Sequence, residues 1–551
     1  MNADRKFEKL KNEMLERFYR IYPEMASYIG LHDPYDNQLS KGDLTLYSDI
    51  EKLLEEFENR MKETIDFDEL SELKKLEWEY IERALPLHRF FVHEQRQSEL
   101  NPDAFFPLGY TFFMMIARNY APFEVRMKAM ASRIEQIPQY LKEFRTRFAE
   151  TRPVKFWLEI ALETAQQMTM FFQFLSHLSK GQISVEAQER LDNCVSALDQ
   201  PLKEHMKWLQ ELQSKTTDNW ALGKDRFEKL LQLRGFEMTS EEILQYGVEA
   251  LKTLKAERAQ IAAQIDPQSS VEEVMTTISL DRPETFEEVL TEAREAMQEA
   301  KQFIIENDIV SIYKEDELIV EETPAYLATL IPLAAMIPGS LYDTPPIGVF
   351  LMTRPEDMNK PGLDYLSHEG IRGTAVHEAF PGHFLQTSAS SRETLIPLFS
   401  ALITFLGSET WEGWAMYCEE MMLEKGFLKG AKAKMIQLNA AIFRAVRIIV
   451  DVRMSRGEMT IEDAVNMGMK ETGVSKEAAI AEVRRYTIMP GQPLSYLIGK
   501  HLILQLRDEI KEKMGSKFSD RFFHDTITAY GEFPISMIKA FFTRQISKLE
   551  S

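Results

Sequence analysis

Cysteine is scarce in this chain of 551 residues, which contains only Cys194 and Cys418, in unrelated sequence contexts. Two isolated cysteines cannot form a disulfide framework or a zinc site built from thiolates. Long hydrophobic runs are also lacking, and the longest apolar stretch, residues 326–342, is interrupted by Pro332 and Pro338. We therefore interpret that stretch as buried core and expect no transmembrane helix.

Positive charge is in short supply as well. The chain has 65 Lys and Arg against 87 Asp and Glu, which gives a formal net charge of −22. Binding to nucleic acid or to an anionic membrane needs concentrated Lys and Arg, so the sequence predicts neither partner. The N-terminal residues 1–18 are charged and amphipathic and lack the apolar core of a signal peptide, which predicts a cytoplasmic protein.

Helical periodicity, by contrast, is abundant. Apolar residues recur at intervals of three and four, with charged residues between them, which is typical of amphipathic helices. The clearest segments are 49–65, 67–85, 126–148, 241–265 and 283–307. Alternation typical of strands is confined to 316–324 and 346–355, both bounded by prolines. The sequence therefore predicts a mainly α-helical protein with a small β ribbon.

The length of the chain exceeds what one simple core accommodates and favours at least two lobes. Residues 266–285 form the softest stretch, so we place the boundary between an N-terminal helical lobe, 1–270, and a C-terminal catalytic lobe, 271–551. Gly, Pro, His and aromatic residues gather between about residues 324 and 499. Functional sites are often found where helices are short and interrupted in this way.

The segment "HEAFPGH", residues 377–383, resembles the helix on which two histidines one turn apart hold zinc, but its second histidine comes six positions after the first. In a straight helix that spacing places the two side chains about 240° apart. Pro381 clashes with the carbonyl of His377 in a regular helix, and Gly382 can adopt backbone conformations closed to other residues. A bulge or break at 381–382 therefore allows His377 and His383 to meet.

A catalytic zinc usually has three protein ligands and one open position. The segment 408–426 offers a third ligand, and Glu412, flanked by Trp411 and Trp414, is our first choice because a buried carboxylate needs a partner. Glu409 and Glu419 remain rival choices. Glu378 would then serve as general base toward the attacking water.

Chance is the alternative explanation of the motif. His–Glu pairs also occur at His93–Glu94 and at His368–Glu369, and nothing in the context of either selects it as a site. We interpret His368, about half a turn around the helix from His377, as a surface or capping residue.

Three blocks, "HEAFPGHFLQ", "EGWAMYCEE" and "RRYTIMPGQPLSYLIG", closely resemble those of a bacterial family, domain-of-unknown-function family 885. The segment 23–40 is similar to the opening block of that family, so the resemblance spans most of the chain. It implies a two-lobed, zincin-like helical metallopeptidase that binds one zinc ion through His377, His383 and Glu412, with Glu378 as the base. Many relatives have a second consecutive histidine where this chain has Phe384.

An oxyanion formed during hydrolysis needs hydrogen-bond donors beside the metal. We predict Tyr486 first and Tyr496 second for this role, on a helix, tight turn and helix marked by Pro490 and Gly491. Arg485 is a candidate clamp for a substrate carboxylate. The alternative is that the tyrosines belong to the core and that the arginine forms a structural ion pair.

The strand predicted at 346–355 is a candidate edge strand beside the cleft, where an extended peptide can add as a further strand. Gly348 would permit close backbone approach of such a peptide, although a plain two-stranded ribbon is the alternative.

Together these features predict a zinc-dependent metallopeptidase acting on short peptides or peptide-like amides. A zinc hydrolase of a non-peptide amide or ester, and a catalytically silent helical binding protein, are the alternatives. The sequence leaves the oligomeric state open.

Overall fold

The computed structural model of the protein describes residues 2–313, 317–323, 331, 333–340, 342, 346–394 and 406–550. The chain is 72% helix and 3% strand, which confirms the predicted mainly α-helical class. No helix within the described ranges is long and apolar enough to cross a membrane. The chain divides into two compact units: unit 1 is Met1–Trp220 with Ser340–Thr344, and unit 2 is Ala221–Gly339 with Pro345–Ser551.

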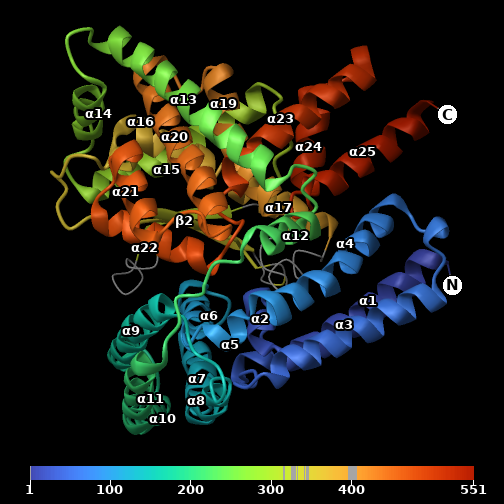
Figure 1. Ribbon diagram of the computed structural model, residues 1–551, viewed down its shortest axis with the longest axis vertical. Coiled ribbons are helices and arrows are strands. Elements are labelled where there is room, and N and C mark those ends of the chain that lie inside the picture. Colours follow the sequence, from blue (N-terminus) through green and yellow to red (C-terminus); the bar gives the residue numbers. More distant parts are fainter. Residues whose placement is uncertain are drawn as a thin grey trace. The chain divides into compact units, whose positions relative to one another are not determined.

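Unit 1 consists of helices, drawn in blue to green in Figure 1. They are α1 (Ala3–Ile21), α2 (Pro23–Tyr28), η1 (Tyr35–Asn37), α3 (Thr45–Thr64), η2 (Phe67–Glu69), α4 (Glu72–Arg89), the π-helical η3 (Phe90–Gln95), α5 (Gln97–Leu100), α6 (Phe106–Ala117), α7 (Phe123–Ile134), α8 (Ile137–Thr146), α9 (Lys155–Ser179), α10 (Val185–Ala197), α11 (Asp199–Leu212) and η4 (Gln213–Lys215). The segment predicted as one helix at 126–148 is two helices, because Pro138 stands at the start of α8.

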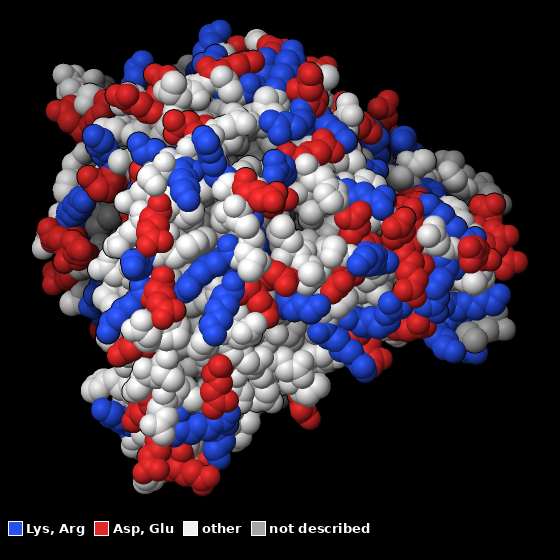
Figure 2. Space-filling view, turned by 60° about the horizontal axis from the view of Figure 1, so that its bottom comes forward, with Lys and Arg blue, Asp and Glu red and all other residues white. Residues whose placement is uncertain are grey.

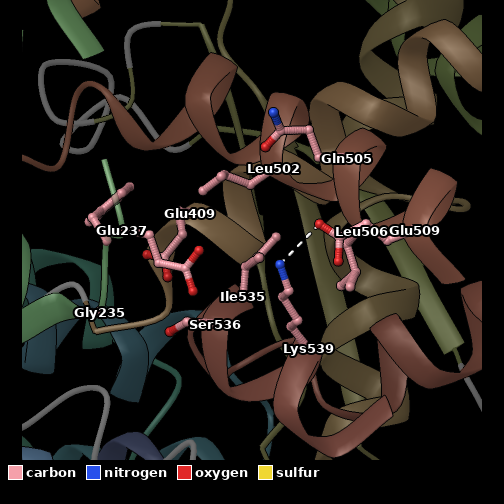
Figure 3. Close-up of a pocket in the computed structure, with 11 residues that line it drawn as sticks. Gly235, Glu237, Glu409, Leu502, Gln505, Leu506, Glu509, Ile535, Ser536 and Lys539 are labelled. Atoms are coloured by element: carbon pink, nitrogen blue, oxygen red, sulfur yellow. Dashed lines mark hydrogen bonds and ion pairs between the residues drawn. The ribbon is translucent and has the colours of Figure 1, made fainter. Parts of the chain in front are cut away.

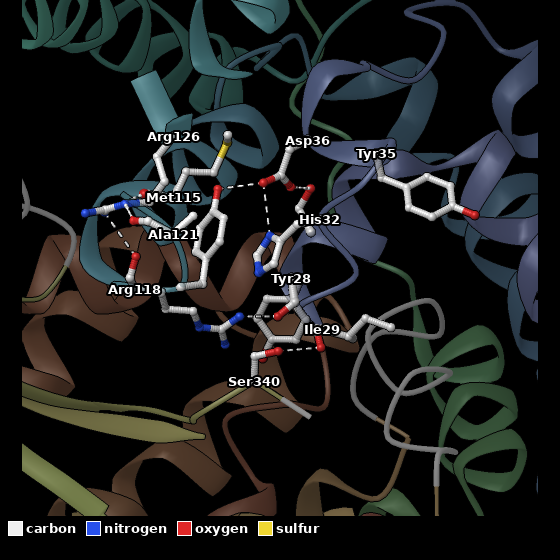
Figure 4. Close-up of polar contacts among 12 residues, drawn as sticks. Tyr28, Ile29, His32, Tyr35, Asp36, Met115, Arg118, Ala121, Arg126 and Ser340 are labelled. Carbon is white, nitrogen blue, oxygen red and sulfur yellow. Dashed lines mark hydrogen bonds and ion pairs between the residues drawn. The ribbon is translucent and has the colours of Figure 1, made fainter. Parts of the chain in front are cut away.

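Several buried polar groups in unit 1, those drawn in Figure 4, are bonded to other parts of the fold. Asp36 accepts hydrogen bonds from His32 Nδ1 at 3.0 Å and from the Tyr120 hydroxyl at 2.6 Å. The Arg126 guanidinium donates to several main-chain carbonyls that follow α6, among them that of Arg118 at 3.0 Å. These bonds fix the loops between the helices, as expected of buried polar groups in a structural role.

Unit 2 contains the remaining helices and the strands, drawn in green to red in Figure 1. The helices are α12 (Lys224–Arg234), α13 (Ser240–Ile265), α14 (Val271–Leu280), α15 (Phe286–Glu306), η6 (Asp364–Leu366), α16 (His368–Glu378), α17 (His383–Glu393), α19 (Ser408–Glu424), α20 (Gly430–Ser455), α21 (Ile461–Thr472), α22 (Lys476–Ile488), α23 (Ser495–Met514), η7 (Gly515–Lys517), α24 (Asp520–Ala529) and α25 (Ile535–Glu550). The predicted helix, turn and helix around Gly491 is confirmed by α22 and α23.

The boundary between the compact units lies at Trp220 and Ala221, whereas the soft stretch 266–285 lies within unit 2. That stretch contains α14, which begins at a capping box formed by Ser270 and Glu273. Val274 and Ile278 of α14 pack in a small core against α13 and α20. The sequence pattern of 266–285 resembles a linker because α14 is short and its flanks are polar.

Within the described residues the sheet has three strands, β1 (Glu317–Glu322), β2 (Ala334–Ile337) and β3 (Ile347–Met352), in the order β1-β3-β2. β3 pairs in parallel with β1 and antiparallel with β2. β3 is thus the central strand, so the prediction that it lies at the edge is wrong. β2, inside the apolar stretch interpreted as core, occupies an edge instead.

Acidic and basic side chains are interspersed over the face drawn in Figure 2. Charged side chains also form pairs between helices, such as Arg17 with Glu56 and Arg60 with Glu13 in unit 1. The face in Figure 2 carries charges of both signs, which is typical of a solvated surface.

Candidate metal centre

The helix that carries His377 is interrupted, as the sequence predicts. α16 ends at Glu378, and α17 begins at His383. The Phe380 N–H bonds the Ala375 carbonyl at 3.2 Å, and the Gly382 N–H bonds the Val376 carbonyl at 3.0 Å. These wide turns use the free carbonyls at the end of α16 and bring the start of α17 back beside its last turn.

Gly382 makes the close return possible because it has no side chain. A Cβ atom there would lie 1.9 Å from the His377 carbonyl oxygen and 2.5 Å from that of Val376. Its φ is −69° and its ψ is −136°, so the backbone there is not left-handed. The sequence prediction attributes Gly382 to its backbone freedom, and the structure adds that no side chain fits at this position.

His377, His383 and Glu412 converge, and all three are buried. One nitrogen of each histidine and one oxygen of the carboxylate lie within 4.8 Å of one another. The rings of the two histidines are nearly perpendicular, with centroids 4.8 Å apart. The six-residue spacing therefore presents both imidazoles to one point once the helix is broken.

The distances fit a metal better than a direct hydrogen bond. His383 Nε2 and Glu412 Oε2 are 3.5 Å apart, longer than an ordinary N–H···O bond of about 2.7–3.2 Å. Two ligands of one tetrahedral zinc, each bound at about 2.0–2.1 Å, are about 3.4 Å apart. In addition, His383 Nδ1 is buried without a hydrogen-bond partner. The donor set of two imidazoles and one carboxylate fits zinc.

Glu419 orients one of these histidines. His377 Nδ1 donates to Glu419 Oε1 at 2.7 Å, which leaves Nε2 of the ring with its lone pair. Histidines that bind metals commonly donate their other ring N–H to a carboxylate in this way. From the sequence, Glu419 was considered only as a rival ligand. In the structure it bonds the candidate ligand His377 and is not one of the three converging residues.

Glu409, the other rival, is occupied elsewhere. Its Oε2 accepts a hydrogen bond from Arg234 at 3.3 Å. The side chain lines a separate pocket, together with Gly235, Ile535 and Lys539 (Figure 3). The lining of that pocket includes none of the three converging residues.

Glycine also positions α19, the helix of Glu412. Gly413 of α19 and Gly499 of α23 face each other so closely that a Cβ on Gly499 would lie 1.8 Å from the Glu409 carbonyl oxygen. The Trp414 indole N–H donates to the Pro381 carbonyl at 2.8 Å and ties α19 to the break between α16 and α17. These contacts hold the two sources of ligands together.

The electrostatic balance of the cluster favours a cation. Burial alone would lower the pKa of His383, but Glu412 and the other carboxylates nearby raise it. Burial would raise the pKa of Glu412, but His383 and His377 lower it. Glu378 and Glu419 add further carboxylates, so the cluster gathers more acid than base, and a divalent ion would compensate for it.

Glu378 lies beside the ligands and is held by the sheet. Its Oε2 accepts a hydrogen bond from the Met336 N–H of β2 at 3.1 Å. β2 thus fixes the predicted base through the edge that faces away from β3.

The two predicted tyrosines differ in their relation to the ligands. Tyr496 interacts electrostatically with Glu412, and burial raises the pKa of its phenol. The Tyr486 hydroxyl donates to Glu482 and accepts from Arg447 Nε at 3.1 Å. Tyr496, ranked second from the sequence, is therefore the tyrosine that interacts with a candidate ligand.

Arg485 reaches the ligands only through an intermediate. It donates to Gln492 Oε1, and Gln492 Nε2 lies 3.4 Å from Glu412 Oε1. Arg485 also donates to Glu482 at 3.2 Å. The geometry is that of the structural ion pair named as the alternative, with a positioning effect on Glu412.

Gly348 lies on the central strand β3, and the Phe384 ring occupies the space beside its Cα. A Cβ there would meet the Phe384 ring at 2.6 Å. The close approach that the glycine permits is therefore with Phe384 of α17. His368 is at the start of α16 and is bonded to Glu292 at 2.7 Å, which confirms it as a surface residue.

Sequence reasoning missed Gln492 as a contact of Glu412, and Arg447 and Glu482 as a network behind the tyrosines. A signal existed for Glu419, because it follows Glu412 by seven positions and so lies on the same face of α19. No local signal points to Arg447, which comes from a different helix, α20.

Comparisons with known proteins agree with this architecture. The family model described as "Bacterial protein of unknown function (DUF885)" matches residues 23–541. None of the curated proteins matches the chain. A putative lipoprotein from Colwellia psychrerythraea is 18% identical, with a TM-score of 0.84 over 99% of this chain and 100% of that one. A putative lipoprotein of unknown function from Shewanella oneidensis is 21% identical, with a TM-score of 0.78 over 97% and 99%.

These two structures share the fold of this chain, and the family model covers nearly its whole length. The chain therefore belongs to the DUF885 family of bacterial proteins of unknown function.

Proposed function

We propose that the protein is a zinc-dependent peptidase that hydrolyses short peptides. The observation that carries the proposal is the convergence of His377, His383 and Glu412 in a buried cluster, with a further carboxylate oriented on His377. A structural zinc site usually has four protein ligands, whereas three leave a position open for chemistry.

His377, His383 and Glu412 are the residues that would hold the ion. Bound there, zinc supplies a Lewis acid that activates water and polarises a carbonyl. Glu378 takes a proton from the attacking water and delivers it to the leaving amine. Because the Met336 N–H occupies Oε2 of Glu378, Oε1 is the oxygen available for that proton.

Tyr496 is the preferred donor to the oxyanion. Its phenol interacts electrostatically with Glu412, and the raised pKa keeps it protonated at neutral pH. A protonated phenol beside the ligands stabilises negative charge as it develops on the carbonyl oxygen. Tyr486 bonds Arg447, whose guanidinium packs against the Tyr496 ring, and so helps to position Tyr496.

The edge strand supports a peptide as substrate. The outer edge of β2 lies beside Glu378, which takes the Met336 N–H and leaves the other main-chain groups of that edge for a peptide. An extended peptide is commonly held by main-chain hydrogen bonds to such an edge. We therefore keep the prediction that a peptide adds as a further strand, and we assign it to the edge of β2 instead of β3.

Glu378→Gln tests the proposal. The amide cannot take a proton, so the rate of cleavage of a peptide library, measured by mass spectrometry, is expected to fall about 10²- to 10⁴-fold while zinc content is unchanged. His368→Gln, at the other end of α16, is the matched control and should retain full activity. Full activity in Glu378→Gln, or no cleavage by the zinc-loaded wild type, would contradict the proposal.

A further inference from the structure

Three arginines gather next to the candidate ligands and outnumber their acidic partner. This arginine cluster consists of Arg444 and Arg447 of α20 and Arg485 of α22. Glu482 is the carboxylate bonded to two of them. Among the described residues, Glu482 is therefore the carboxylate that these arginines share through hydrogen bonds.

Two members of the cluster are satisfied. Arg447 Nη2 donates to Glu482 at 2.9 Å, and its Nε also bonds the Tyr486 hydroxyl. Arg485 bonds Glu482 and Gln492. The two arginines, drawing on the same carboxylate, lower the pKa of Glu482 to about 2 although burial opposes this.

Arg444 has no carboxylate partner among the described residues. Its one hydrogen bond goes from Nη1 to the Ala440 carbonyl of its own helix, at 3.4 Å. Its Nε is buried without any partner. A partly buried guanidinium left in this state costs free energy, and an anion that bonds it bidentately would remove that cost.

Arg444 is also close to the ligands. Its guanidinium lies 5.7 Å from the centre of the Tyr496 ring, and Tyr496 in turn interacts electrostatically with Glu412. Arg447 lies 4.6 Å from the same ring. Arg444 further helps to lower the pKa of Glu419, the partner of His377. One phenol side chain therefore separates Arg444 from a candidate ligand, a span of the order of one or two extended residues at about 3.3–3.6 Å each.

We propose that Arg444, with Arg447 beside it, binds a carboxylate of the substrate, one or two residues from the bond that is cleaved. The proposal rests on the proposed peptidase function and extends it to a substrate class, peptides that carry a free C-terminal carboxylate or an acidic side chain at that position. Arg485, the arginine chosen from the sequence, is a positioning residue that acts through Gln492.

Binding measurements test the subsite apart from catalysis. In the zinc-loaded Glu378→Gln background, calorimetry compares acetyl-trialanine as free acid, the same peptide as C-terminal amide, and an amide with a central glutamate. The free acid is expected to bind about 10- to 100-fold more tightly than the plain amide, the usual worth of a charge-assisted pair. Arg444→Gln should reduce this preference to about threefold or less.

Two variants control for the fold. Arg453→Gln changes another arginine of α20, nine positions away, and should keep the preference for the free acid. Arg444→Lys keeps the positive charge but loses the planar pair of donors, so it should retain part of the preference for the free acid.

The outcomes are distinct. A preference for the free acid that is lost in Arg444→Gln assigns the carboxylate to the C-terminus and predicts cleavage near that end. A preference for the glutamate amide, lost in the same variant, assigns it to a side chain. Equal binding of all three peptides, or a preference that survives in Arg444→Gln, overturns the subsite. Absence of cleavage by the wild type would instead remove the proposed function while leaving a measured acid preference intact.

Discussion

A buried histidine in unit 1 and a buried histidine in unit 2 are placed in opposite surroundings. His205 of α11 is 1% exposed, and both of its ring nitrogens lack partners. It packs among the rings of Phe105, Phe144 and Trp208, at 5.2–6.3 Å between centroids. His383 is also buried, at 6% exposed, but carboxylates face it. Burial therefore does not distinguish a structural histidine from a candidate ligand, whereas convergent donors and acidic neighbours do.

Two arginines, one in each unit, also differ. Arg133 of unit 1 donates to the Gln38 and Tyr35 carbonyls, at 3.0 and 3.2 Å, and to other acceptors around them. Arg444 of unit 2, which is partly buried, bonds only the carbonyl one turn earlier in its own helix, as far as the described residues go. Arg133 is therefore satisfied by the fold, whereas Arg444 keeps donors for a ligand.

Gly382→Ala should damage unit 2 most. The new Cβ would meet the His377 carbonyl, so the end of α16 must shift and both histidines with it. We expect a loss of about 3 kcal/mol in the free energy of unfolding or, if the strain is relieved at the site, a fall of about 100-fold in zinc affinity. Gly373→Ala, in the interior of the same helix with open space around it, should instead stabilise by about 0.5–1 kcal/mol. Equal effects of the two substitutions would remove the role given to Gly382.

Glu419→Gln should have the next largest effect, on zinc affinity alone. The amide still accepts from His377 Nδ1 but no longer carries charge, so affinity measured by competition with a chelator should fall about 10- to 100-fold. Glu420→Gln, the neighbouring residue paired with Lys500, serves as control and should change affinity less than about twofold. An unchanged affinity in Glu419→Gln would place Glu419 outside the site.

His205→Phe tests the unit 1 side of the comparison and should have the smallest effect. Burial, assisted by Arg145, lowers the pKa of His205 to about 3, so the unfolded chain binds a proton that the folded chain does not. The free energy of unfolding therefore falls as pH drops below about 6.5, by about 2 kcal/mol at pH 5. Phenylalanine removes that loss, so urea unfolding should show a gain at pH 5 that is absent at pH 7. Equal gains at both pH values would contradict a neutral buried His205.

The main features of the site could be predicted because they are local in the sequence. The helix breaker between His377 and His383 and the aromatic flanks of Glu412 act within a few residues, and the structure brings these three side chains together. The ligand roles themselves stay predictions. β1 and β3 were also recognisable, since their alternation is bounded by prolines.

Contacts between distant segments could not be predicted in the same way. β2 has only four residues in an apolar stretch, and its place at the edge follows from pairing with β3. Arg447 of α20 and Arg485 of α22 both bond Glu482, and Arg444 does not. Such choices are made by packing between helices, which periodicity within one helix does not reveal.

The metal content of the purified protein tests the central claim most directly. After zinc loading and dialysis, the wild type and Glu378→Gln should each retain one equivalent of zinc, measured by mass spectrometry of the metal. His383→Ala and Glu412→Ala should retain none, while His368→Ala, on the surface at the start of α16, should retain one. Less than one equivalent in the wild type, or full retention in His383→Ala, would contradict the assignment of this cluster as a metal centre.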